Sequence, residues 1–249
     1  MSLQPLVLPD ADAVGAEVAA TILDRLAAAP GRPFLLGCPS GRTPMPVYRA
    51  LAGHAARGVD LSRLVIVMMD DYVEPDGSRR VAPELSYSCL GFAQRQIVAP
   101  IGQDMEIWAP DPAEPDRYDD AIAAAGGIDL FLLATGARDG HIAFNQPGTP
   151  RDARTHVTTL GEATRRDNMG TFPEFTSLDM VPTQGVTVGI DTIAGSSREV
   201  IMIVSGSHKH AAYQRIKAAK AYEPDWPATI VVECKNPTLI ADRAAFEGI

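Results

Sequence analysis

The amino-acid sequence predicts an α/β fold: a single Rossmann-like domain with a mostly parallel sheet and helices on both faces. Short apolar runs of strand length alternate with longer amphipathic stretches, which is the pattern of consecutive β-α units. The chain has 249 residues, 46% of them hydrophobic, so it can bury a full core, and α/β folds of this length commonly form one domain. No internal repeat or low-complexity tract indicates a different organisation.

The first predicted element is an amphipathic helix over residues 12–28. Val14, Val18, Ile22 and Leu26 recur at four-residue spacing, and Pro30-Gly31 ends the pattern. Further helical stretches are expected at residues 45–56, 85–97, 115–125 and 208–220. Residues 147–185 form the least regular stretch, and a long irregular segment in a compact domain is often a lid or a binding loop.

Four apolar runs lie between these helices, and each is too short for a core helix. They are predicted to be buried strands at residues 34–36, 64–69, 128–133 and 200–204. In open α/β sheets, ligands bind beyond the carboxyl ends of the strands. Polar loops follow all four runs, so those loops are expected to meet at one rim and to hold the functional residues.

Charge and composition exclude several classes of partner. The net charge of -9 and the absence of any Lys/Arg cluster argue against nucleic acid. Neither a signal peptide nor an apolar run of about 20 residues is found, so we expect a soluble, cytoplasmic protein with no membrane partner. Cys38, Cys89 and Cys234 are far apart and show no CxxC spacing, so they are expected to be buried, reduced thiols rather than zinc ligands.

Two of the polar loops could bind a phosphate. Ser40-Gly41-Arg42-Thr43-Pro44 joins a strand to a helix, where backbone N–H groups, hydroxyls and the helix dipole favour an anion. Lys209 lies at a helix start, where a cation is unfavourable unless it serves an anion. The alternatives are an ordinary β-α turn and a solvated surface lysine.

The other two loops could carry acid–base chemistry. Asp70 and Asp71 follow a strongly apolar run, so one carboxylate should point into the cleft as a general base, while the other turns to backbone or solvent. In Asp139-Gly140-His141, the carboxylate could orient the imidazole or act on substrate. The alternatives are a helix cap or a Mg²⁺ site for the aspartates, and a structural role for the histidine.

Taken together, these motifs resemble the glucosamine-6-phosphate deaminase family. Residues 139–147, DGHIAFNQP, differ at one position from the family's DGHIAFNEP. Residues 69–72, MDDY, resemble its MDEY, and residues 186–190, VTVGI, resemble its TVGV segment. The resemblance implies a cofactor-independent enzyme that converts an amino sugar 6-phosphate to a ketose 6-phosphate with release of ammonia. It also implies that the protein could be a homo-oligomer, as such deaminases often are.

The resemblance also implies roles for individual residues. The aspartate matching Asp70 moves a proton between C1 and C2 of the sugar, with Asp71 as a supporting residue here. The pair matching Asp139 and His141 assists ring opening and the chemistry at the amino carbon. The lysine matching Lys209 binds the 6-phosphate. The position matching Gln146 completes the catalytic group.

Three departures from the family pattern leave other functions open. Gln146 replaces a glutamate, and Gly170 stands where the deaminases have a phosphate-binding arginine. Arg42 stands where many deaminases have a small residue, and its loop looks more like that of 6-phosphogluconolactonases. Arg42 is therefore expected to bind the phosphate from the opposite side. The alternative functions are a sugar-phosphate lactonase and a binding protein without turnover.

Overall fold

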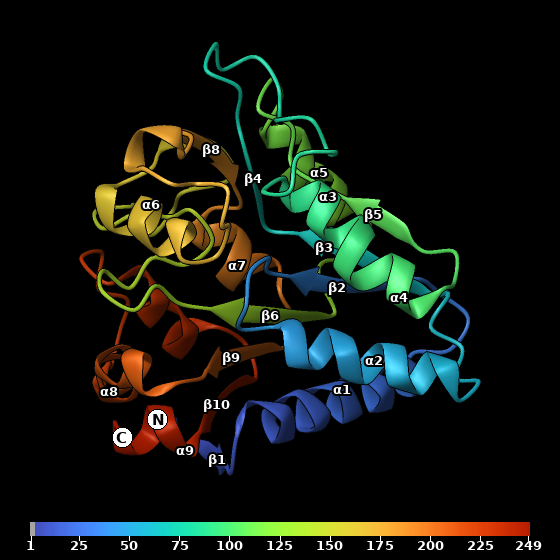
Figure 1. Cartoon of the computed structure of the whole chain (residues 1–249). Helices are drawn as coiled ribbons and strands as arrows, with labels where there is room; N and C mark the ends of the chain where they lie inside the picture. Colours follow the sequence, from blue (N-terminus) through green and yellow to red (C-terminus); the bar gives the residue numbers. More distant parts are fainter. Residues whose placement is uncertain (1–2) are drawn as a thin grey trace.

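Residues 3–249 are described by a computed structural model, in which a seven-stranded sheet forms the centre of the molecule (Figure 1). All its strand pairs are parallel, and the spatial order is β1-β10-β9-β6-β2-β3-β5. In that order the strands are Leu6–Leu8, Pro237–Asp242, Val200–Val204, Leu130–Ala134, Phe34–Cys38, Leu64–Met68 and Glu106–Trp108. The predicted α/β fold with a mostly parallel sheet is confirmed.

Helices cover both faces of this sheet, because successive strand side chains point to opposite faces and both sets are apolar. Leu36 packs into one apolar cluster and its neighbour Leu35 into the other. On the Leu36 face lie α1 (Ala11–Ala28), α2 (Met45–Ala56) and a continuous segment formed by α3 (Cys89–Phe92), η1 (Ala93–Val98) and α4 (Ala99–Ile101). On the Leu35 face lie α5 (Asp116–Ala124), α7 (Ile190–Ser196), α8 (His210–Ala218), η4 (Pro227–Glu233) and α9 (Arg243–Glu247).

A second, three-stranded antiparallel sheet stands beside the carboxyl ends of the main strands. Its order is β4 (Asp70–Tyr72), β8 (Gln184–Thr187) and β7 (His156–Thr159). A third apolar cluster, rich in aromatic rings, packs against it. This cluster contains Tyr72, Val81, Phe144, Leu160, Phe172, Phe175 and Val181.

Most predicted elements are present, with shifted ends. Residues 45–56 and 200–204 are a helix and a strand with the predicted bounds. The helix expected at residues 85–97 begins four residues later, at Cys89, and contains a π-helical stretch, Ala93–Val98. Residues 147–185 are rich in loops, as predicted, and they also contain β7, α6 (Glu162–Met169), η2 (Leu178–Met180) and the start of β8.

The topology places a crevice between β2 and β6. The chain runs from β2 to β3 and β5 on one side, whereas β6 is followed by β9 and β10 on the other side. Neighbouring loops therefore diverge at the carboxyl ends of β2 and β6, which is where open α/β sheets bind ligands. The loops at residues 39–44 and 135–145 lie there.

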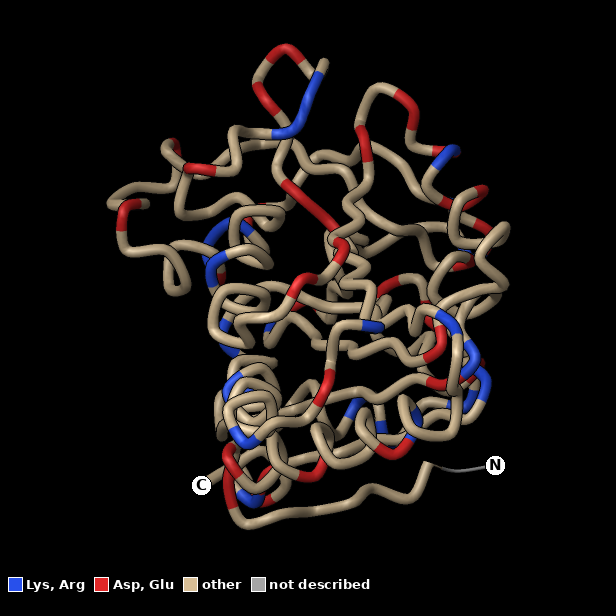
Figure 2. Tube along the Cα trace, turned by 90° about the vertical axis from the view of Figure 1, so that its right-hand side faces the viewer, with Lys and Arg blue, Asp and Glu red and all other residues tan. Residues whose placement is uncertain are grey.

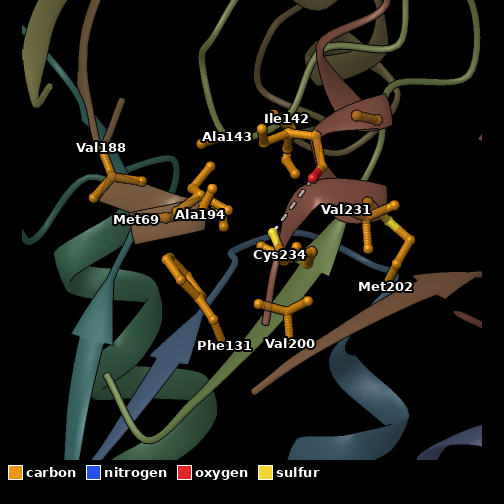
Figure 3. Packing of buried hydrophobic residues seen from close by; sticks show 14 of the residues in the cluster. Met69, Phe131, Ile142, Ala143, Val188, Ala194, Val200, Met202, Val231 and Cys234 are labelled. Atoms are coloured by element: carbon orange, nitrogen blue, oxygen red, sulfur yellow. Dashed lines mark hydrogen bonds between the residues drawn. The ribbon is translucent and has the colours of Figure 1, made fainter. Parts of the chain in front are cut away.

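The apolar core supports the residues at this crevice. Figure 3 shows Ile142 and Ala143 packed among buried side chains that include Met69 and Val188. His141 precedes Ile142 and Asp70 follows Met69, so the packed core holds the backbone of both site residues in place. All three cysteines are free and buried, as predicted.

Other features of the chain bear on its partners. Within residues 3–249, no helix is both long and apolar enough to cross a membrane. Figure 2 shows acidic and basic residues spread over the whole trace, in keeping with the net charge of -9.

Candidate active site

A cavity of about 590 Å³ opens at the crevice, and loops far apart in sequence form its wall. Asp70, His141 and Lys209 line it from three separate segments, which are the start of β4, the loop after β6 and a short 3-10 helix, η3 (Ser207–Lys209). The loop after β2 contributes Ser40, Gly41, Arg42 and Thr43. The other predicted residues, Asp71, Asp139 and Gln146, are not part of the lining and lie next to residues that are.

Asp70 and Asp71 point in different directions. Asp70 faces the cavity and is 5% exposed, and within residues 3–249 its Oδ1 has no hydrogen-bond partner. Burial raises its pKa to about 7; the thiol of Cys89 opposes this rise, whereas the charge of Asp71 adds to it. A carboxyl group with such a pKa can gain and lose a proton near neutral pH, as a general base must.

Asp71 instead anchors the backbone. Its oxygens accept hydrogen bonds from the backbone N–H groups of Tyr72, Cys89 and Leu90 at 2.8, 2.8 and 3.0 Å. The two latter groups belong to the first turn of α3, whose N–H groups lack partners within the helix. Asp71 thus ties β4 to that helix and fixes the position of Asp70.

His141 is paired with Asp139 in a tight loop after β6. The Nδ1 atom of His141 lies 2.7 Å from Oδ1 of Asp139. Burial raises the pKa of Asp139, but the hydrogen bonds and charge of His141 outweigh it, so the pKa lies below its usual range. The loop needs glycine at position 136, since a Cβ there would lie 2.2 Å from Nδ1 of His141. Gly140 has a positive φ of 65° and leaves room for the Trp226 indole.

Hydrogen bonds hold the three best-matched motifs together. The side-chain amide of Asn145 donates to the carbonyl oxygen of Val188 at 2.8 Å. The backbone N–H of Phe144 donates to Thr187 Oγ1 at 3.1 Å. The backbone N–H of Val188 donates to the carbonyl oxygen of Met69 at 2.8 Å, next to Asp70. The three motifs are far apart in the sequence but adjacent in the fold.

Gln146 is directed toward α6 rather than into the cavity. Its Oε1 accepts hydrogen bonds from the backbone N–H of Gly161 at 2.9 Å and from the Thr164 hydroxyl at 3.0 Å. Its Nε2 donates to the carbonyl oxygen of Phe144 at 3.0 Å. The amide orientation is fixed by these partners, since only Oε1 can accept the Gly161 proton.

Cations gather at the other end of the cavity. Lys209 is only 9% exposed, and its Nζ donates a hydrogen bond to Thr43 Oγ1 at 2.9 Å. Burial lowers its pKa to about 8, and the charge of Arg42 acts in the same direction, whereas that of Asp167 opposes it. A Cβ atom on Gly170 would lie 3.7 Å from Nη2 of Arg42, so Arg42 reaches the region next to that glycine. A phosphate would relieve the mutual repulsion of these cations.

Sequence reasoning missed the part of the site that α6 supplies. Asp167 and Asn168 from α6, and Thr171 and Phe172 just after it, line the cavity. One signal was present: Glu162 and Arg166 are four residues apart, the spacing of a helical ion pair, and they do pair through Arg166 Nε at 2.7 Å. The helix lacks an apolar stripe, because Thr164 is its only buried residue.

The chemistry available is acid–base catalysis on a small anionic molecule. Among residues 3–249, no group of three or more His, Cys, Asp or Glu side chains is placed to hold a metal ion. The cavity instead combines the buried carboxyl group of Asp70, the Asp139–His141 pair and a cationic end with Lys209.

The fold and this cavity define an α/β enzyme whose candidate catalytic groups lie at a topological switch point, in the same cavity as Lys209 and Arg42. The chain belongs to the family of glucosamine-6-phosphate isomerases and 6-phosphogluconolactonases, whose model matches residues 9–240. Glucosamine-6-phosphate deaminase of Bacillus pumilus is 34% identical over 245 residues, which cover 95% of each chain. That of Streptomyces avermitilis is 37% identical over 254 residues, with 98% of this chain and 91% of the relative covered.

Solved structures show the same architecture. A monomeric glucosamine-6-phosphate deaminase superposes with a TM-score of 0.87 at 26% identity, covering 99% of this chain and 100% of the other. A 6-phosphogluconolactonase from Trypanosoma cruzi superposes with a TM-score of 0.73 at 19% identity, covering 99% and 97%. At that lower identity, the lactonase likeness establishes the fold alone.

Proposed function

We propose that the protein is an amino sugar phosphate deaminase and aldose–ketose isomerase, which converts a substrate such as glucosamine 6-phosphate to a ketose 6-phosphate and ammonia. The observation that carries this proposal is Asp70, a buried carboxyl group in the cavity wall with a pKa raised to about 7 by burial. The relatives named glucosamine-6-phosphate deaminase, which are 34–37% identical to this chain over most of its length, support the same activity.

In this proposal the cationic end of the cavity determines how the sugar lies. Lys209 and the loop containing Thr43 bind the 6-phosphate, and Arg42 adds a second cation from the side of Gly170. The sugar carbons then extend from the phosphate toward Asp70 and His141 on the same cavity wall. Positioning of this kind is a large part of what an enzyme without a cofactor can supply.

The proposed chemical steps give His141 and Asp70 separate proton transfers. His141, supported by Asp139, assists opening of the sugar ring to the aldehyde. Asp70 removes the C2 proton while the aldehyde oxygen O1 gains a proton from solvent, which gives an enol. Asp70 then returns its proton to C1, and the electron pair of the amine forms a protonated imine at C2. Water then adds to the imine carbon, and ammonia leaves as the ketone forms. No electrons are transferred, so the reaction requires no redox cofactor.

A lactonase is the second candidate, and Gln146 is the observation that favours it. An amide at this position cannot carry the negative charge that would help keep His141 protonated. In a lactonase, His141 would activate water for attack on the lactone carbonyl, and no carbon-bound proton would move. Asp70 would then have no chemical step.

The Asp70→Asn variant separates the two candidates. The wild-type protein should release ammonia from glucosamine 6-phosphate and, in D₂O, place deuterium at C1 of the ketose. Asp70→Asn should lose both activities by about 10²–10⁴-fold, the usual contribution of general acid–base catalysis. Hydrolysis of a 6-phosphogluconolactone at the same rate by both proteins, with no ammonia from either, would assign the chain to the lactonases.

Two finer points belong to the same proposal. We place the reaction in the cytoplasm, where sugar phosphates are metabolised. We also keep the homo-oligomer as a prediction, although one solved relative is described as monomeric. Sedimentation at micromolar concentration measures the oligomeric state directly.

A further inference from the structure

Thr164 lies at the meeting point of three polar side chains that the proposed chemistry depends on. Its hydroxyl oxygen is 3.1 Å from Nδ1 of His141, 3.3 Å from Oδ2 of Asp139 and 3.0 Å from Oε1 of Gln146. The residue is fully buried, at 0% exposure, in the middle of α6. A hydroxyl placed in this way cannot exchange its partners for water.

The direction of each hydrogen bond follows from the chemistry of the groups. The carboxylate of Asp139 can only accept, so the proton shared at 2.7 Å with His141 belongs to Nδ1. Oε1 of Gln146 is also an acceptor, because it already accepts the Gly161 N–H. The Thr164 proton therefore goes to an oxygen of Gln146 or Asp139, and a lone pair of its oxygen faces the Nδ1 proton.

The result is a histidine with one defined tautomer. With the proton on Nδ1, the other ring nitrogen, Nε2, has its lone pair free on the side of the ring turned away from Asp139. His141 lines the cavity, so Nε2 is the nitrogen available to a substrate oxygen or a water. The two partners on Nδ1, Asp139 and Thr164, come from different elements and prevent the ring from rotating.

We propose that Thr164 is a positioning residue that holds the Asp139–His141 pair in its active geometry, and that Gln146 serves to hold Thr164 rather than to contact substrate. This inference rests on the proposed function for its kinetic consequences, but its geometric part concerns the protein alone. It also gives α6 a role: the helix that contributes Asp167 and Asn168 to the cavity orients the catalytic histidine with the same rigid segment.

Kinetics test the role by a split between turnover and binding. Thr164→Val removes the hydroxyl and keeps the shape, so we expect kcat to fall by about ten- to a hundredfold, the usual effect of losing a residue that orients a catalytic histidine. KM should stay within about threefold, since the phosphate end is untouched. Thr164→Ser restores the hydroxyl and should recover most of the turnover. Thr164→Ala serves as a second hydroxyl-free variant if the valine does not fold.

A matched control is available in Thr155, another buried threonine, 3% exposed, whose hydroxyl has no partner and which does not line the cavity. Thr155→Val should leave kcat, KM and the pH profile unchanged. This control measures how much turnover changes when a buried threonine outside the cavity wall is replaced by valine. A loss of turnover in Thr155→Val equal to that in Thr164→Val would overturn the proposed role.

Nitrogen NMR of the imidazole provides a readout that needs no substrate. The chain has five histidines, and His141→Ala assigns the His141 signals. In the neutral imidazole of the wild-type protein, Nδ1 should show the chemical shift of a protonated nitrogen and Nε2 that of an unprotonated one. In Thr164→Val, Asp139 still keeps the proton on Nδ1, but the ring loses its second partner, so the Nδ1 shift should move from its wild-type value as the hydrogen bond to Asp139 weakens.

Two outcomes would overturn the inference: unchanged nitrogen shifts in Thr164→Val, or wild-type kcat in the same variant. If the wild-type protein makes no ammonia, the proposed function fails, while the NMR comparison still decides the role of Thr164.

Discussion

Lys209 and Thr43 are 166 positions apart in the chain, yet Nζ of Lys209 donates a hydrogen bond to the Thr43 hydroxyl at 2.9 Å. This contact closes the cationic end of the cavity, because it joins the loop after β9 to the loop after β2. Arg42, beside Thr43, reaches the space next to Gly170. A phosphate at this end would therefore be held from at least two sides.

Arg42→Ala tests whether the arginine has taken over phosphate binding from position 170. A charge-assisted hydrogen bond contributes about 1.5–3 kcal/mol, so KM for the phosphorylated sugar should rise roughly ten- to a hundredfold. An unphosphorylated analogue should bind almost as before. Arg117→Ala, which removes an exposed arginine paired only with Glu114, controls for the change in net charge. Equal losses for both ligands would mean that Arg42 does not bind the phosphate.

His141→Ala tests the acid–base group. We expect turnover to drop by about 10²–10⁴-fold, while the affinity for a sugar phosphate stays close to that of the wild-type protein. The reason is that His141 and Lys209 line the same cavity from separate segments. Single-turnover kinetics and calorimetry measure the two quantities. A variant with near-normal kcat would remove His141 from the mechanism.

The sequence predicted the fold well where buried runs are continuous. Residues 200–204 are five consecutive buried apolar residues between polar neighbours, and they form β9 with those bounds. It failed for β5, which is only three residues long, and for β10, which starts with Pro237. β5 is a short strand at the edge of the sheet, and β10 lies between β1 and β9, so both form through pairing with neighbouring strands, which is tertiary information.

The part of the candidate site that directly follows the predicted strands could be predicted from the sequence. Asp70, His141 and Lys209 were found in this way, and all three line one cavity. Thr164 was not found, because it lies in a helix without an apolar face and meets His141 across 23 positions. The orientation of Gln146 was equally out of reach, since it depends on the backbone N–H of Gly161 and the hydroxyl of Thr164, which are 15 and 18 positions away in the chain.

Asp70→Asn should stabilise the protein in a pH-dependent way. Burial raises the pKa of Asp70 from 3.8 to about 7, so the folded state binds its proton more tightly than the unfolded state does. The stability contributed by Asp70 therefore falls as pH rises from about 4 to about 7 and stays low above that range. Asparagine does not titrate and avoids the loss.

The expected size follows from the pKa difference. Each pH unit between the two pKa values corresponds to about 1.4 kcal/mol, so the advantage of Asp70→Asn should be larger at pH 8 than at pH 5 by about 2–3 kcal/mol. Urea unfolding of both proteins at the two pH values measures it. An advantage that is the same at pH 5 and pH 8 would show that Asp70 titrates normally and would weaken its assignment as a base.

Lys209 should make phosphate binding depend on pH in the alkaline range. Burial lowers its pKa from 10.5 to about 8 in the free protein, so the ammonium group loses its proton above that value. A phosphate dianion binds the charged form better, and the Kd of a sugar phosphate should therefore rise about tenfold per pH unit above pH 8. Glucitol 6-phosphate is a suitable ligand because it has no amino group that titrates. Lys209→Arg provides the control, since a guanidinium stays charged through this range and the Kd of this variant should remain nearly constant to pH 10.

His208, whose pKa is lowered by burial and by Lys209 and Arg42, is neutral throughout that range and does not contribute to the slope. A wild-type Kd that is flat from pH 8 to pH 10 would mean that Lys209 keeps its proton without a ligand, or that it does not bind the phosphate. Lys209→Met distinguishes these, because its affinity at pH 7 falls only if Lys209 binds the phosphate.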